Sequence, residues 1–193
     1  GSYGRGDYKF EDVFFATKEN GWEEPVDDRE TKIYAYYLEM EVVAAARGRS
    51  KVLINQEKRA AAATFGNVDI NTTAAGTVFS SHSSATPVDK IEVAIQAIWA
   101  RTGVWPNTLV LSYLLFRELR RCDQILDQIQ SAGAGDQTRT RDVTAQQLSE
   151  VLDLDNILIA GGSRNTAKKG QTASVAQIWD KTKCMVGVLP TGA

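Results

Sequence analysis

The sequence predicts an α+β protein in which one long helix accompanies several shorter helices and a few short, buried strands. Residues 28–65 contain no proline and are rich in Ala, Glu, Lys, Arg and Leu, which favour helix. Two short apolar runs, Thr108–Ser112 and Ile157–Ala160, are typical of buried strands. Segments with helical periodicity surround both runs, so we expect helices and strands to share a core.

The long helix has recognisable ends. Acidic residues at Asp27–Glu30 follow Pro25 and suit the positive end of a helix, and Gly66 supplies a stop. The expected helix, 28–65, would span about 57 Å, whereas a globule of this chain length is about 40 Å across. Its overhanging surface would need a partner. A break at Gly48 is the alternative. The apolar residues expected on one face are Ile33, Tyr36, Tyr37, Met40, Val43 and Ala44.

The remaining elements follow from caps and turns. We expect an extended arm or hairpin over 3–22, with a β-like run at Val13–Thr17 and a turn at Asn20-Gly21. Residues 66–86 read as a loop or short strand pair. A helix over 87–102 would be capped by Thr86 and closed by Gly103. Its core stripe would be Ile91, Ala94, Ile95 and Ile98.

Further along the chain, Ser112 is expected to cap a helix over Tyr113–Gln130 that bends near Cys122-Asp123. Thr144 and Gln147 form a capping box for a helix over Ala145–Leu152. Flexible loops are expected at 132–142 and Gly161–Gly170. The runs 175–179 and 183–189 are expected to pair as a closing hairpin.

Composition narrows the function classes. The chain has 193 residues, enough for one domain or two small ones. Its 22 Lys and Arg nearly cancel 24 Asp and Glu, which disfavours bare nucleic acid as the main partner. No apolar run reaches the length of a membrane span, so no transmembrane helix is expected. The first residues contain no apolar run of the signal-peptide type, so no secretory signal is expected.

Chemistry-bearing residues are few. The single histidine, His82, lies in a polar stretch that reads as a mobile loop, and a Ser-His-Asp or Cys-His enzyme could use only that residue. Cys122 and Cys184 lack metal-binding spacing and are expected to be reduced, partly buried thiols. We therefore predict no catalytic, cofactor-binding or metal-binding residue.

One loop leaves a second interpretation open. Gly161–Gly170 follows a predicted strand and contains Gly, Ser, Thr and Lys, as phosphate-binding loops do. The order Gly-x-x-x-x-Gly-Lys-Ser/Thr is absent, and no convincing helix follows. The alternative function is thus an α/β enzyme or small-molecule binder that uses this loop. The acidic pairs Glu23-Glu24, Asp27-Asp28 and Asp153 with Asp155 are explained by helix starts and a turn.

Five segments, in this order, resemble the major capsid proteins of tailed phages and prophages. The segments are Asn20–Glu30, a long helix with Glu57–Ala61, Gly103–Ser112, Asn156–Ala167, and Ser174–Pro190 with Ile178-Trp179. The resemblance implies the capsid fold shared by tailed phages and herpesviruses. That fold has an extended loop, a long spine helix, a peripheral β-rich domain and a central axial α/β domain.

The resemblance also implies a domain plan. Residues 1–25 would be the extended-loop region, 26–86 the spine helix and peripheral domain, 87–170 the axial domain, and 171–193 a closing hairpin returning toward the peripheral domain. Family members normally carry an N-terminal arm ahead of this point and often more chain after it, so we expect the natural chain to be longer.

By the same resemblance, the protein would be a structural head subunit, without enzymatic activity or cofactor, that self-assembles into the icosahedral shell enclosing phage DNA. Its partners would be copies of itself in pentamers and hexamers, together with scaffold, portal and decoration proteins. DNA would be enclosed without sequence-specific binding, and no membrane would be involved. The protein would reside in the virion, after a stage in the host cytoplasm. A cellular nanocompartment shell of the same fold is a further alternative. The loops 132–142, with Arg139 and Arg141, and 161–170 are expected to line the five- or six-fold axis.

Overall fold

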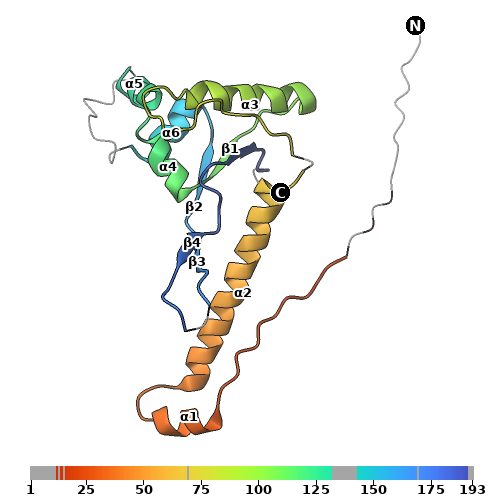
Figure 1. Ribbon diagram of the computed structural model, residues 1–193. Helices are drawn as coiled ribbons and strands as arrows, with labels where there is room; N and C mark the ends of the chain where they lie inside the picture. Colours follow the sequence, from red (N-terminus) through yellow and green to blue (C-terminus); the bar gives the residue numbers. More distant parts are fainter. Residues whose placement is uncertain are drawn as a thin grey trace. The chain divides into compact units, whose positions relative to one another are not determined.

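The computed structural model describes residues 12, 14, 16–68, 70–131, 143–168 and 170–190. The chain forms two compact units, Gly1–Val52 and Leu53–Ala193, called unit 1 and unit 2 below. The boundary falls inside helix α2 (Met40–Phe65), so one continuous helix contributes its first half to unit 1 and its second half to unit 2 (Figure 1). The predicted loop at 132–142, with its arginines, lies outside the described residues, as does most of 3–15.

Unit 1 contains α1 (Asp28–Tyr34) and the first half of α2, preceded by residues 16–27 without helix or strand. The predicted acidic start of α1 is confirmed. The Asp27 side chain accepts a hydrogen bond from the Arg29 backbone N–H at 2.8 Å, which satisfies one of the unpaired donors at a helix N-terminus. No residue of α1 is buried.

The prediction of one helix over 28–65 is wrong at residues 35–39. Helix α1 ends at Tyr34 in a turn, where the Tyr37 and Leu38 N–H groups both donate to the Tyr34 carbonyl. Aromatic residues are mediocre helix formers, and the exposed side chains of Tyr36 and Tyr37 gain no packing here that would offset this. Helix α2 instead passes unbroken through Gly48, whose cost of about 1 kcal/mol is tolerated among good helix formers.

The break also changes the length argument. The 26 residues of α2 span about 39 Å, close to the diameter expected for a globule of this chain length. Helix length by itself therefore no longer demands a partner. The expected apolar face is also not a buried one, because Ile33, Tyr36 and Tyr37 are largely exposed.

Unit 2 is built on a three-stranded sheet in the order β2-β1-β5. The central strand β1 (Thr108–Ser112) pairs in parallel with β2 (Asn156–Ala160) and antiparallel with β5 (Cys184–Gly187). Leu109 lies opposite Ile157 on one side and Val186 on the other. The parallel pair requires a long crossover, which here includes the helices α4 (Tyr113–Leu119), α5 (Asp123–Ser131) and α6 (Ala145–Leu152).

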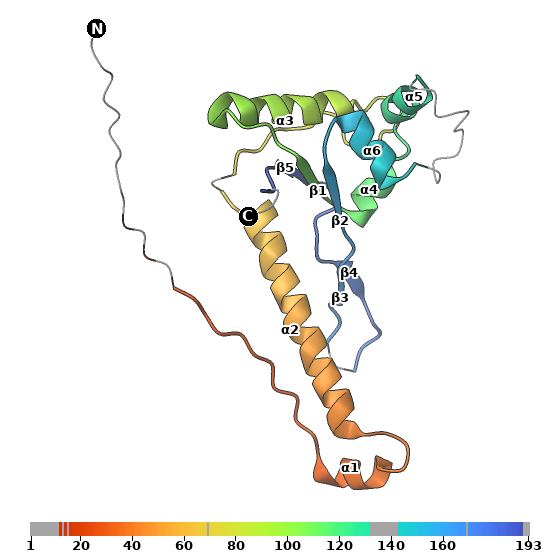
Figure 2. The ribbon, with the colours of Figure 1, turned by 180° about the vertical axis from the view of Figure 1, so that it is seen from behind.

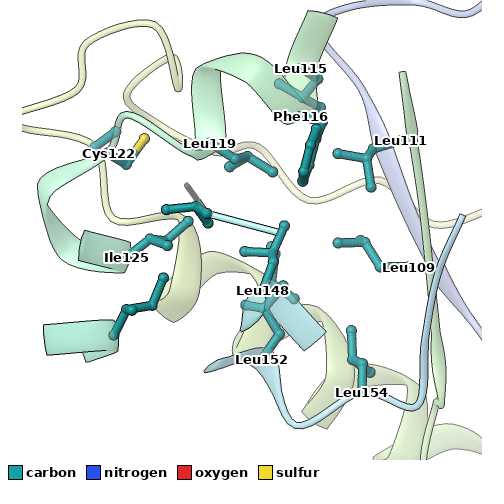
Figure 3. Packing of buried hydrophobic residues seen from close by; sticks show 14 of the residues in the cluster. Leu109, Leu111, Leu115, Phe116, Leu119, Cys122, Ile125, Leu148, Leu152 and Leu154 are labelled. Atoms are coloured by element: carbon teal, nitrogen blue, oxygen red, sulfur yellow. The ribbon is translucent and has the colours of Figure 1, made fainter. Parts of the chain in front are cut away.

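The core of unit 2 lies between this sheet and its helices. Figures 1 and 2 both place α4, α5 and α6 together beside β1 and β2, with α3 (Pro87–Thr102) nearby. Figure 3 shows leucines of β1 pointing toward side chains from α4 and α6. The buried hydrophobic cluster consists of Ala85, Ile91, Ile95, Leu109, Leu111, Leu115, Phe116, Leu119, Cys122, Ile125, Ile129, Val143, Leu148, Leu152 and Leu154.

Several local signals are confirmed. Gly103 ends α3 in the left-handed conformation, with φ +70° and its N–H donating to the Trp99 carbonyl at 2.8 Å. Ser112 Oγ accepts from the Leu115 N–H, which explains a fully buried serine. Thr144 and Gln147 bond reciprocally, side chain to backbone, at 3.2 and 3.0 Å. The expected bend near Cys122 is a full break between α4 and α5.

The prediction that the Thr86 side chain caps α3 is wrong. Thr86 precedes α3 as predicted, but its side chain makes no capping hydrogen bond. The Val88 N–H in the first turn instead donates to Gln124 Oε1 of α5 at 3.0 Å. A side chain from another helix thus does what the local sequence was expected to do, because α3 and α5 pack together in the core.

The predicted closing hairpin between 175–179 and 183–189 is also wrong. Strand β4 (Val175–Gln177) pairs with β3 (Ser163–Asn165), which lies inside the predicted Gly161–Gly170 loop. Strand β5 pairs with β1 in the main sheet instead. Cys184 and Val186 pack against the buried cluster, and burial of apolar side chains is worth more than a local two-stranded pairing.

Candidate interaction surfaces

The single histidine fastens one segment of unit 2 to another. His82 Nε2 lies 2.6 Å from Glu118 Oε2 of α4, and the His82 carbonyl accepts from the Asp123 N–H at 3.1 Å. The segment was expected to be a mobile loop, but it is held in hydrogen-bonded turns. Among the described residues, no three His, Cys, Asp or Glu side chains come together as metal ligands would. His82 thus joins its segment to α4 through the side chain and to the start of α5 through the backbone.

Neither thiol is poised as a nucleophile. Burial, together with the smaller effects of the nearby carboxylates of Glu118 and Asp123, raises the pKa of the Cys122 thiol to about 11. Burial likewise raises the pKa of Cys184 to about 11. Cys122 Sγ donates to the Phe79 carbonyl at 3.5 Å. Both groups are therefore protonated at neutral pH, whereas the thiolate is the reactive form.

The Gly161–Gly170 loop is organised by its own side chains. Asn165 Oδ1 accepts from the Ala167 and Ser174 N–H groups, both at 3.0 Å, and the Thr166 N–H donates to the Ser174 carbonyl. These N–H groups are thereby used within the hairpin. The loop leads into β4, whereas a phosphate-binding loop leads into a helix N-terminus. The geometry therefore differs from a phosphate cradle.

The second half of α2 is fastened to the C-terminal segment of unit 2. Trp179 Nε1 donates to Glu57 Oε1 at 2.8 Å, and the Trp179 ring meets Phe65 edge to face at 5.4 Å between centroids. Lys183 Nζ donates to the Phe65 carbonyl at 3.1 Å. Glu57, Ala61 and Phe65 share one helix face by their four-residue spacing, and Ala61 is the buried residue of α2. We call this set the Trp179 clasp.

Close approach explains a glycine in the same region. A Cβ on Gly162 would collide with the Glu57 carboxylate. The Gly162 carbonyl also accepts from the Ile178 N–H at 3.0 Å. Sequence reasoning reached Glu57 and Trp179 only through the family resemblance, because no local signal links residues this far apart in the chain.

Unit 1 exposes an aromatic surface at the turn between its helices. Tyr36 is 91% exposed, Tyr37 79% and Ile33 68%, and the two tyrosine rings meet edge to face at 5.4 Å between centroids. Leu38 and Val42 are exposed beside them in the sequence. We call these residues the tyrosine tip. Contiguous apolar exposure of this kind marks interaction sites in stable proteins.

Unit 1 also has a shallow groove of about 520 Å³ where the extended segment meets the first half of α2. Its lining includes Trp22, Ala44, Ala45 and Gly48. The Trp22 indole N–H donates to Glu24 at 3.0 Å, and Lys51 Nζ lies 5.8 Å from the Trp22 ring centroid, a cation–π distance. Small residues on α2 thus let the extended segment lie close to the helix.

Unit 2 carries its own half-exposed aromatic pair. Trp99 and Trp105 stack with centroids 5.3 Å apart and planes 18° from parallel, and they are 46% and 58% exposed. Elsewhere in unit 2 a smaller hollow of about 360 Å³ is lined by Leu114, Gln177, Trp179, Asp180 and Lys181. The Trp99–Trp105 pair thus presents exposed aromatic surface to other molecules.

Comparisons with known proteins add a likeness of fold. No protein-family model matches the chain, and no curated protein matches its sequence. The crystal structure of a phage-related protein from Bordetella bronchiseptica superposes with a TM-score of 0.53 at 15% sequence identity. The match covers 88% of this chain and 50% of that protein, so the chain spans half of its length. At this identity the likeness is one of fold.

Within the described ranges, no helix is both long and apolar enough to cross a bilayer.

Proposed function

We propose that this protein is the major capsid subunit of a tailed phage or prophage, a non-enzymatic protein that self-assembles into the icosahedral head enclosing the DNA. The observation that carries the proposal is the likeness of fold, over 88% of the chain, to a protein described as phage-related. The five segments that resemble phage major capsid proteins support it independently, because they were identified from the sequence alone.

The proposal gives each element a role in the capsid fold. Residues 16–39 would form the extended loop, and α2 would be the spine helix. The β3–β4 hairpin and the second half of α2 would belong to the peripheral domain. The sheet β2-β1-β5 with α3–α6 would form the axial domain. The Trp179 clasp would then fix the spine helix to the segment that returns from the axial domain.

The surfaces support an assembling subunit. A stable protein interface buries about 800 Å² on each partner, and each aromatic side chain can supply roughly 150–250 Å² of it. The tyrosine tip and the Trp99–Trp105 pair could therefore each supply part of the area that a lateral contact buries. In a ring of identical copies, each such contact joins two different faces.

The proposed partners follow from this role. Copies of the chain would associate as pentamers and hexamers, with scaffold, portal and decoration proteins as further partners. DNA would be enclosed without sequence-specific binding, in keeping with the near-neutral net charge of −2. The protein would occupy the virion, after a stage in the host cytoplasm.

Electron microscopy and analytical ultracentrifugation of the full-length protein test the proposal. We expect rings of five or six copies, or closed particles. The double variant Tyr36→Ser/Tyr37→Ser should lower the yield of assemblies and leave the folded monomer intact. Tyr113→Ser, at a half-exposed tyrosine outside the tyrosine tip, is the control. A strictly monomeric full-length protein with saturable nucleotide binding through Lys168 would contradict the proposal and favour the enzyme alternative. Particles from the native host that hold protein cargo instead of DNA would indicate a nanocompartment shell.

A further inference from the structure

The dipeptide Asn20-Gly21 lies in the extended segment of unit 1. Asn20 is the one asparagine of the 193-residue sequence that glycine follows. Both residues are exposed and lie outside helix and strand. An asparagine side chain can be attacked by the backbone nitrogen of the next residue, and a following glycine hinders that attack least because it has no Cβ and the widest backbone freedom.

The surroundings leave the reacting groups accessible. A Cβ at Gly21 would meet no atom within 4 Å. In the described part of the chain, no hydrogen bond engages the Gly21 N–H. The Asn20 side chain makes one exposed hydrogen bond, from Nδ2 to the Lys18 carbonyl at 2.9 Å, with which water competes. Hydrogen bonds of the fold therefore do not hold the Gly21 nitrogen and the Asn20 side-chain amide apart.

Three other asparagines are restrained, and they show what protection looks like. Both polar atoms of the Asn107 side chain bond the backbone of Leu189, at 2.8 and 2.7 Å. Asn55 lies within helix α2 and Asn156 within strand β2. Asn71 is exposed and irregular like Asn20, but a threonine follows it. Asn71 therefore separates the effect of the following glycine from the effect of exposure.

The structure assigns Asn20-Gly21 as a site of spontaneous self-modification by succinimide formation. The Gly21 nitrogen attacks Asn20 Cγ and forms a new C–N bond. Ammonia leaves with Nδ2 and the proton from the Gly21 nitrogen, which closes a five-membered imide. Water then opens the imide at either carbonyl. Cleavage at the Cγ–N bond gives aspartate in the normal chain, and cleavage at the other C–N bond gives isoaspartate. The net change is loss of ammonia and uptake of water.

Either product alters the segment that lies along α2. It adds one negative charge beside Glu19, in a stretch that already holds Glu23 and Glu24. Isoaspartate also adds one methylene to the backbone two residues before Trp22, whose ring faces Lys51 and whose indole N–H bonds Glu24. The modification thus acts on the contact between the extended segment and the helix in unit 1.

Peptide mapping by mass spectrometry tests this on folded protein held at physiological temperature and mildly alkaline pH. Timed samples are digested, and each asparagine peptide is followed for replacement of NH by O. Isoaspartyl-specific enzymatic methylation quantifies the isoaspartate. We expect Asn20 to convert on the order of tenfold faster than Asn71, because glycine removes the steric barrier. Asn107 and Asn156 should convert more slowly still. Equal rates at Asn20 and Asn71 would overturn the assignment.

A substitution that should leave the fold unchanged provides the second test. Gly21→Ala fits without a clash and without a left-handed backbone, so the fold should be unchanged. It should nevertheless slow conversion at Asn20 on the order of tenfold, since the added Cβ restores the barrier. Gly161→Ala, which is equally unhindered, should leave the Asn20 rate unchanged. Anion-exchange chromatography should resolve an aged species with one extra negative charge in the wild type but not in Asn20→Gln. An unchanged rate in Gly21→Ala would also overturn the assignment.

Discussion

Unit 1 and unit 2 differ in how far their apolar side chains are buried. Unit 2 buries a contiguous cluster between sheet and helices, with Leu109, Leu119 and Leu148 fully enclosed (Figure 3). In unit 1 no residue of α1 is buried, and the tyrosine tip is exposed. Burial of apolar area is the main favourable term in folding. Unit 2 therefore has the means to stabilise itself, whereas the apolar side chains of unit 1 remain available for contacts with other molecules.

Helix α2 shows the same contrast within a single element. In its first half, which belongs to unit 1, small residues face the extended segment, and Lys51 lies over the Trp22 ring of that segment. Its second half, in unit 2, contains buried Ala61 and carries Glu57 and Phe65 of the Trp179 clasp. Most helical stability in proteins comes from packing rather than from propensity. The second half should therefore resist local opening more strongly than the first.

The largest expected effect is a cavity in the core of unit 2. Leu109→Ala or Leu148→Ala should lower the free energy of unfolding by about 2–5 kcal/mol, because each side chain is fully buried and the cavity cannot fully collapse. The matched change in unit 1, Ile33→Ala, should alter it by less than about 0.5 kcal/mol. Urea denaturation followed by circular dichroism measures both. A comparable loss from Ile33→Ala would abolish the contrast between the units.

The Trp179 clasp should give the next largest effect. Trp179→Phe keeps a ring but removes the N–H donor and leaves the half-buried Glu57 carboxylate without it. We expect a loss of about 1–2 kcal/mol in unfolding free energy, typical of a hydrogen bond to a charged group that is partly exposed. Trp105→Phe, at an exposed indole, is the control and should be nearly neutral. Hydrogen exchange should also quicken over residues 53–65, and unaltered exchange there would argue against the clasp.

Matched helix caps sharpen the comparison further. Thr144→Ala breaks the capping box of α6, whose Leu148 and Leu152 are in the core, and should cost about 1 kcal/mol of unfolding free energy. Asp27→Ala removes the equivalent cap of α1. It should leave the global transition in place, because no residue of α1 is buried. Thermal unfolding measures the loss of stability in both variants. Equal losses in Thr144→Ala and Asp27→Ala would contradict the contrast between the units.

The smallest expected effect is a pH dependence near the end of unit 2. The Thr182 hydroxyl and backbone N–H both donate to Asp180 and lower the pKa of its carboxyl below 3.8. Since the folded pKa is the lower one, the ionised carboxylate stabilises the fold above pH 3.8, and this contribution disappears as pH falls through the folded value. Asp180→Asn should flatten the acid side of the stability profile slightly. A variant profile parallel to the wild type would contradict this.

Local chemistry made much of unit 2 predictable. Strand β1 and helix α6 have the predicted ends, and Gly103, Ser112 and the Thr144 box act as their positions indicate. Each of these signals depends on residues within four positions of one another, so its energy is fixed by the local sequence. The inward positions of α3 followed the same helical period, and Ile91 and Ile95 are buried.

The failures share a different cause. The break at residues 35–39 depends on what the tyrosines can pack against, and sequence periodicity suggested a buried face that the structure does not form. The partner of β5 depends on competition between a nearby strand and a distant core. The Asn107 side chain, which both donates to and accepts from the Leu189 backbone, joins the residue before β1 to the segment after β5, at the end of that strand pair. No local pattern encodes such a choice.

The sequence by itself thus determined the helix-forming segments, the caps, the buried strands and the scarcity of reactive groups, because propensity, capping and composition are properties of short stretches. Only the tertiary structure decided where the long helix breaks, which strands pair, and that Glu57 meets Trp179. Those outcomes depend on which apolar surfaces gain most by leaving water together. That gain is a property of the assembled core and not of any one segment, so it can be evaluated only once the distant parts of the chain have met.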